Sequence, residues 1–103
     1  METREMTLVT IVAERLLKKR VLEGIRSVGA RGWTLTDVTG EGDHRISAHE
    51  WEGPSVKVET LVTDEVARKI LELVSGRYFE HHAVIVFTSP VRVIRGEKFR
   101  DRS

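Results

Sequence analysis

Apolar and polar residues alternate with two different periodicities in the first third of the chain. Residues 6–13 are rich in β-branched side chains, which predicts a strand. Over residues 14–28, apolar positions recur at spacings of three and four between charged ones, a pattern typical of an amphipathic helix. Gly29 can adopt a positive φ without steric cost and is expected to end this helix. A second strand is predicted over residues 33–38.

The same succession returns in the second half of the chain. Residues 55–62 begin with strict alternation of apolar and polar side chains, which predicts a third strand. Thr63 is a suitable N-cap for a helix whose apolar stripe ends near Gly76. The uninterrupted apolar run of residues 83–87 predicts a central strand that is covered on both faces, and residues 91–94 predict a short extra C-terminal strand.

The order of these elements indicates the fold class. Strand, helix, strand, strand, helix, strand is a split β-α-β repeat, and the two helical stripes correspond at a fixed offset, as Leu17 does with Val66. We expect a single α+β domain over residues 1–103, with a four-stranded antiparallel sheet and both helices on one face. Apolar residues occur on both faces of the first and last strands, which indicates that another subunit covers the opposite face.

The segment between the second and third strands, residues 39–54, has no sustained apolar period, and we call it the arm. A connection of this length in so small a domain is usually functional or disordered, so we expect it to carry function. Flexible, ionisable and aromatic residues are concentrated there: Gly40, Gly42, Gly53, Asp43, His44, Arg45, His49, Glu50 and Trp51. Trp51 suits an anchor for a docking partner.

Composition excludes several functions. The chain has 17 Lys and Arg against 16 Asp and Glu, so it has no excess field to hold nucleic acid or an anionic membrane nonspecifically. Cys is absent, which removes disulfides and thiolate sites and suits a reducing cytoplasm. No stretch approaches the roughly 18 apolar residues of a spanning helix. We expect a soluble, cytoplasmic protein.

Familiar nucleotide and enzyme motifs are missing. A dinucleotide fingerprint beginning at Gly40 would need a third glycine where Arg45 stands, and no Walker A sequence occurs. The predicted first and third strands lack the aromatic residues on which RNA-recognition modules stack bases. No nucleophile with a neighbouring base can be assembled, which favours a binding protein over an enzyme. What Gly40 and Gly42 can offer is close backbone approach to an anion, beside the guanidinium of Arg45.

A metal site is an alternative use of the arm. His44 and His49, with Asp43 and Glu50 nearby, could hold an ion if the arm folded back, although neither spacing nor a helical context favours it. On a strand, the adjacent His81 and His82 would point to opposite faces and could not grip one ion together. A metal-responsive or ligand-free interaction module on the same fold therefore stays as the second hypothesis.

Three segments carry a resemblance to a known family. Residues 32–45 resemble the stretch that enters the T-loop of PII signal-transduction proteins, and residues 56–59 resemble the strand that leaves it. Residues 91–97 are similar to that family's C-terminal strand and its Arg-Thr-Gly-Glu tail. The ending with Arg95, Gly96 and Phe99 looks most like the PII-like branch of bicarbonate-transporter regulators and the carboxysome-associated PII protein.

The resemblance implies a ferredoxin-like homotrimer whose sheets face one another, with an adenine nucleotide in each cleft between subunits. It also implies bicarbonate as a second ligand and a membrane transporter or carboxysome-associated protein as target. No nucleic acid partner is expected, because of the charge balance and the missing strand aromatics. Thr34 and Thr36 would hold the adenosine end, and Glu59 would lie beside the nucleotide. The implied ligand-binding residues are Thr34, Thr36, Gly40, Glu41, Gly42, His44, Arg45, Glu59, His81, Arg92 and Arg95.

One departure from the family pattern bears on the ligand. Residues 81–84, His-His-Ala-Val, stand where a typical PII protein has a Gly-Asp-Gly-Lys phosphate-holding loop. Missing donors weaken binding of distal phosphates, so AMP or ADP is favoured over ATP, with cyclic AMP as an alternative. The T-loop tyrosine that the family modifies is also absent, so uridylylation is not expected. No metal cofactor is expected.

Overall fold

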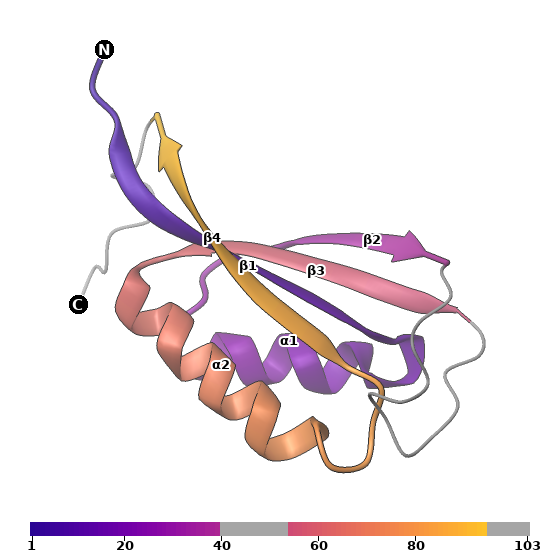
Figure 1. Cartoon of the computed structure of the whole chain (residues 1–103). Helices are drawn as coiled ribbons and strands as arrows, with labels where there is room; N and C mark the ends of the chain where they lie inside the picture. The colour runs from indigo at the N-terminus through magenta and orange to yellow at the C-terminus, as the bar shows by residue number, and fades with distance from the viewer. Residues whose placement is uncertain (40–53, 95–103) are drawn as a thin grey trace.

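The chain folds into one sheet and one layer of helices, in the predicted order. The computed structural model describes residues 1–39 and 54–94. The elements are β1 (Arg4–Glu14), the 3₁₀ helix η1 (Arg15–Leu17), α1 (Lys18–Ser27), β2 (Thr34–Val38), β3 (Ser55–Val62), α2 (Asp64–Tyr78) and β4 (Ile85–Val93) (Figure 1). The α+β, ferredoxin-like βαββαβ architecture is confirmed.

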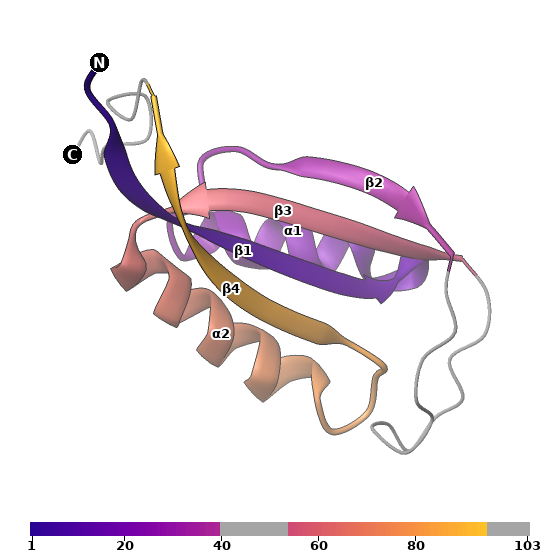
Figure 2. The ribbon, with the colours of Figure 1, turned by 45° about the horizontal axis from the view of Figure 1, so that its top comes forward.

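The four strands pair in the order β2-β3-β1-β4, and every neighbouring pair is antiparallel. Both helices lie on one face of this sheet, as expected from the split repeat (Figure 2). The register aligns Thr34 of β2 with Glu59 of β3, Glu59 with Thr10 of β1, and Thr10 with Phe87 of β4. Residues in such a row share one face, because side chains alternate along each strand.

The prediction for the last strand was wrong in two respects. Residues 83–87 were expected to form a central strand covered on both faces, but β4 lies at the edge of the sheet, and Phe87 is 52% exposed. Residues 91–94 were expected to form a separate strand, but β4 continues through Pro90 to Val93. An edge strand has one row of backbone groups without a ladder partner, so a residue without N–H is tolerated there.

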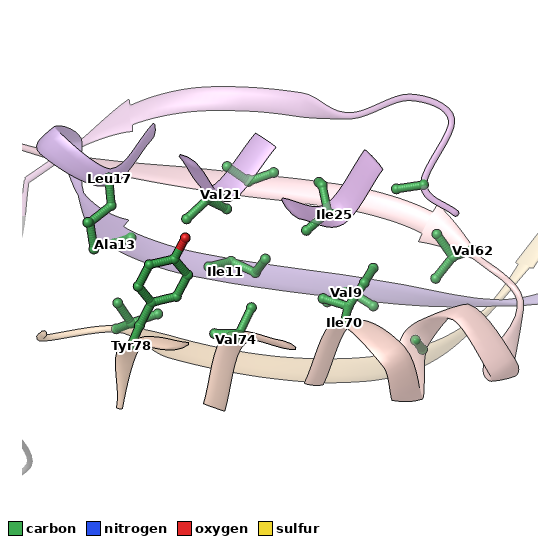
Figure 3. Close-up of a cluster of buried hydrophobic side chains, with 14 residues drawn as sticks. Val9, Ile11, Ala13, Leu17, Val21, Ile25, Val62, Ile70, Val74 and Tyr78 are labelled. Carbon is green, nitrogen blue, oxygen red and sulfur yellow. The ribbon is translucent and has the colours of Figure 1, made fainter. Parts of the chain in front are cut away.

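The core fills the space between the helices and the sheet (Figure 3). Val9 and Ile11 of β1 are wholly buried, and Val58 lies beside them on β3. The helices contribute the apolar stripes that the sequence predicted, each residue at most 1% exposed: Leu17, Val21, Ile25, Ile70 and Val74. Because the apolar residues recur on one side of each helix, both helices contribute to one shared core.

Gly29 ends α1, as predicted. Its φ is 124°, its N–H donates to the carbonyl of Arg26, and the N–H of Ala30 donates to the carbonyl of Ile25 (3.0 Å). These two bonds form a Schellman motif, which satisfies carbonyls that the helix end would leave unpaired. A Cβ at position 29 would also lie 2.9 Å from Val66 Cγ2 of α2. Glycine is therefore required for both the backbone conformation and the helix contact.

The second helix begins at its predicted cap and runs slightly longer than expected. Thr63 Oγ1 accepts a hydrogen bond from the N–H of Val66 (3.3 Å), and Asp64 pairs with Arg68 (2.9 Å), which raises the pKa of that guanidinium. The helix continues to Tyr78, beyond the expected end near Gly76. Within the two described stretches, neither helix has the length and apolar character needed to cross a bilayer.

Candidate functional site

The face of the sheet opposite the helices, which we call the open face, has an apolar half and a polar half. Its apolar half comprises Leu8 and Val12 of β1 with Ile85 and Phe87 of β4. Ile85 is 38% and Phe87 52% exposed, so these side chains are not covered by the described residues. The polar half, on β2 and β3, comprises Thr34, Thr36, Lys57 and Glu59.

The polar half brings three predicted ligand-binding residues together. Thr34 lies directly opposite Glu59, and Thr36 lies opposite Lys57. Lys57 Nζ is 3.8 Å from Glu59 Oε1, with both side chains about one-third exposed. Both threonines are exposed, so their hydroxyls are available to a ligand. Hydroxyl, ammonium and carboxylate groups together suit the hydrogen-bonding groups of a polar organic ligand better than a bare ion.

The stem of the arm is fastened to the end of β1. Val38 and Ser55 form the last register pair between β2 and β3. The N–H of Arg15 donates to the carbonyl of Pro54 (3.1 Å), and its Nη2 lies 2.9 Å from Asp37 Oδ1. Both side chains of this ion pair are more than half exposed, so its contribution is at most about 1 kcal/mol. These contacts fix where the arm leaves the sheet.

In the turn between α2 and β4, residues 79–84, backbone N–H groups donate to acceptors within the chain. The N–H groups of His81 and His82 both donate to the carbonyl of Tyr78, and that of Val84 donates to the carbonyl of His82. The N–H of Ala83 donates to Glu14 Oε1 (3.4 Å), which also lies 3.9 Å from His82 Nδ1. His82 is half-buried against the ring of Tyr78. The turn therefore presents few free backbone donors to an anion.

The structure separates the remaining predicted site residues. His81 is exposed in the turn at the end of the sheet from which the arm leaves. Neither His81 nor His82 lies on a strand, so the argument that strand neighbours point to opposite faces does not apply to them. Arg92 lies opposite Glu5 at the far end of β4. Ile85 shares a register row with Lys57 and Thr36, and Arg92 is seven positions beyond Ile85, about 23 Å along a strand. One chain therefore does not bring Arg92 to the polar half.

The other predicted ligand-binding residues are Gly40, Glu41, Gly42, His44, Arg45 and Arg95, and they lie outside the described residues, as do the proposed metal ligands of the arm. Among residues 1–39 and 54–94, no three potential metal-ligating side chains cluster together. Lys57 was missed as a site residue. The alternation of residues 55–62 places it on the same face as Glu59, and that signal could have identified it.

Comparison with known families gives a match over most of the chain. A family model described as nitrogen regulatory protein P-II matches residues 6–98. Nitrogen regulatory protein GlnK of Escherichia coli strain K12 is 28% identical over 78 residues, which are 68% of this chain and 70% of GlnK.

Solved structures of similar proteins agree with the observed fold. A PII-like signalling protein from Thermus thermophilus is 45% identical, with a TM-score of 0.83 over 97% of this chain and 100% of that chain. CPII from Thiomonas intermedia K12, bound to ADP, AMP and acetate, is 22% identical, with a TM-score of 0.86 over 98% of this chain and 100% of CPII. CPII bound to ADP and bicarbonate is 24% identical, with a TM-score of 0.82 over 96% and 98%.

Proposed function

Because the chain belongs to the nitrogen regulatory protein P-II family, we propose that it is a homotrimeric regulator that binds AMP or ADP between subunits. The observation that carries this proposal is the divided open face. Its apolar half, which includes the exposed Phe87, is suited to burial against the same face of other copies. Its polar half then lies at the margin of that interface, where a ligand can enter.

The positions of the site residues support a site shared between copies. Thr34, Thr36 and Glu59 of one copy would hold the adenosine part through hydroxyl and carboxylate hydrogen bonds. Arg92 lies at the other end of its own chain, so it would act on the nucleotide of a neighbouring copy. Arg45 and Arg95 complete the proposed phosphate contacts, together with the backbone of residues 40–42. His81, exposed in the turn, would contribute a further hydrogen bond.

The turn before β4 supports the preference for AMP or ADP over ATP. Loops that hold a chain of phosphates present free N–H groups, commonly with a lysine. Here the four N–H groups of residues 81–84 are all engaged within the chain. The carboxylate of Glu14 also faces the turn and would repel a distal phosphate. A nucleotide with fewer phosphates needs fewer of these donors.

We extend the proposal to bicarbonate and to inorganic carbon uptake or carboxysome function. Structures of CPII, which share this fold, are described as bound to ADP, AMP and bicarbonate. A small anion beside the phosphate-binding residues would change the affinity for the nucleotide, and the nucleotide would change its affinity equally. The ligands would act by binding one state of the arm more tightly than another. The target would be a membrane transporter or a carboxysome-associated protein reached from the cytoplasm.

Titration calorimetry with AMP, ADP, ATP and cyclic AMP, each with and without bicarbonate, tests this function. We expect AMP or ADP to bind more tightly than ATP. Replacing Thr34→Val or Glu59→Gln should weaken binding about tenfold, because the first removes a hydroxyl and the second replaces a charged acceptor oxygen with an amide donor. Thr88→Val is the matched control: it makes the same chemical change on β4, at an exposed position whose side chain points away from the open face.

Three results would contradict the proposal. Binding of none of the four nucleotides below millimolar concentration would remove the nucleotide function, and a single-chain mass in light scattering would remove the shared site. If a divalent metal bound instead and nucleotides did not, the metal-responsive interaction module would be favoured. The proposal assigns no catalytic step to the chain.

A further inference from the structure

A groove of about 460 Å³ runs between α1 and α2, on the side of the molecule away from the open face. Arg20, Glu23 and Gly24 line it from α1 at spacings that place them on one side of that helix. Gly24 lets the two helices approach closely beside the groove, because a Cβ there would lie 2.8 Å from Leu73 Cδ2. Its size lies within the range of small-molecule sites.

Two guanidinium groups border this groove without a carboxylate partner in the described part of the chain. Arg77 reaches from α2 across to α1, and its Nη1 lies 3.5 Å from the position that a Cβ of Gly24 would occupy. Arg20 borders the groove from α1. Arg15, by contrast, pairs with Asp37, Arg68 pairs with Asp64, and Arg26 lies over the ring of Trp33. The groove therefore brings together two guanidinium groups that have no ion-pair partner among the described residues.

The floor and end of the groove add further hydrogen-bonding groups. Tyr78 is 3% exposed, and its hydroxyl points toward α1 (Figure 3). His82 closes one end and packs edge-on against that ring, with the centroids 6.0 Å apart. Glu23 is the acidic residue among those that line the groove. Positive charge still predominates, with two guanidinium groups to one carboxylate.

We propose that this groove is a second ligand site, which binds the phosphate or carboxylate group of a small metabolite. Guanidinium groups form paired, charge-assisted hydrogen bonds with both kinds of oxyanion. Arg20 and Arg77 hold the oxyanion from the two helices, and Tyr78 and His82 bond the rest of the ligand. The site is formed by one chain and is independent of the nucleotide site proposed at the open face.

Backbone amide NMR of the full chain, titrated with inorganic phosphate and separately with succinate, tests this site. Sodium chloride keeps the ionic strength constant. We expect saturable shifts of the Arg20, Gly24 and Arg77 signals with one or both anions, and the two titrations distinguish phosphate from carboxylate. Arg77→Gln should weaken this binding about tenfold. Arg68→Gln, an exposed arginine of the same helix outside the groove, should leave it unchanged.

Several results would overturn the inference. If sodium chloride alone produced the same shifts, they would reflect screening of charges and not binding of phosphate or succinate. Binding of the anions by Arg77→Gln as tight as by the original chain would exclude Arg77 from the site. Shifts at Thr34 and Glu59 would show that the anions bind at the open face. The groove shifts do not depend on nucleotide binding, so a failure to bind nucleotides in calorimetry would not remove them. The two proposals can therefore fail separately.

Discussion

The two faces of the sheet are built from alternate residues of the same strands, yet their environments differ completely. On the face under the helices, Val9 and Ile11 are fully buried. On the open face, Ile85 and Phe87 are 38% and 52% exposed. The described residues cover one apolar face and leave apolar side chains of the other exposed. An apolar pattern thus specifies that a face is to be buried, but not which molecule buries it.

The largest effect is expected on the covered face. Ile70→Ala removes a wholly buried side chain from α2 and should lower the free energy of unfolding by about 2–5 kcal/mol. Urea unfolding followed by circular dichroism measures it. Glu72→Ala, two positions along at an exposed site, should change stability by less than about 0.5 kcal/mol. Equal losses in the two variants would contradict the assignment of the core to this face.

A substitution on the open face should change the assembly of subunits more than the folding of each chain. Phe87→Glu places a charge in the apolar half and forgoes about 1.5–3 kcal/mol of side-chain burial per subunit at the proposed interface. We expect light scattering to show single chains while circular dichroism retains the helix and strand signal. Thr88→Glu, at the adjacent exposed position facing the other way, should leave the assembly intact. An unchanged mass for Phe87→Glu would contradict burial of this face.

A smaller effect is expected where the helical layer turns back toward the sheet. Gly29→Ala should cost about 1–2 kcal/mol, because its φ of 124° and the nearby Val66 side chain both oppose a Cβ. Gly76→Ala has nothing within 4 Å of the new atom and lies in α2, so it should stabilise the chain by about 0.5–1 kcal/mol. Thermal unfolding of both variants should therefore show shifts of opposite sign.

The smallest effect is expected at the stem of the arm. Arg15→Gln removes the exposed ion pair with Asp37 but keeps the backbone bond to Pro54, so stability should fall by less than about 1 kcal/mol. The loss should shrink as salt is added, because salt screens exposed charges. A larger loss that persists in high salt would show that Arg15 stabilises the chain through packing.

The sequence and the structure agree best where a pattern is local. The β-branched run, the two apolar stripes, Gly29 and Thr63 each specify their element through neighbouring residues, and all of these predictions were confirmed. Among the residues proposed to bind a ligand, Thr34, Thr36 and Glu59 were predicted from a resemblance. The register then placed these three residues side by side, together with Lys57.

By itself the sequence determined the identity and order of the elements and which side of each one is apolar, because these depend on short-range periodicity and backbone preferences. Only the tertiary structure decided that β4 is an edge strand, that Arg92 lies far from the polar half, and that a groove opens at Gly24. Strand order, register and helix contact join residues distant in the chain. Their geometry is set by how all the layers pack together, which no local pattern encodes.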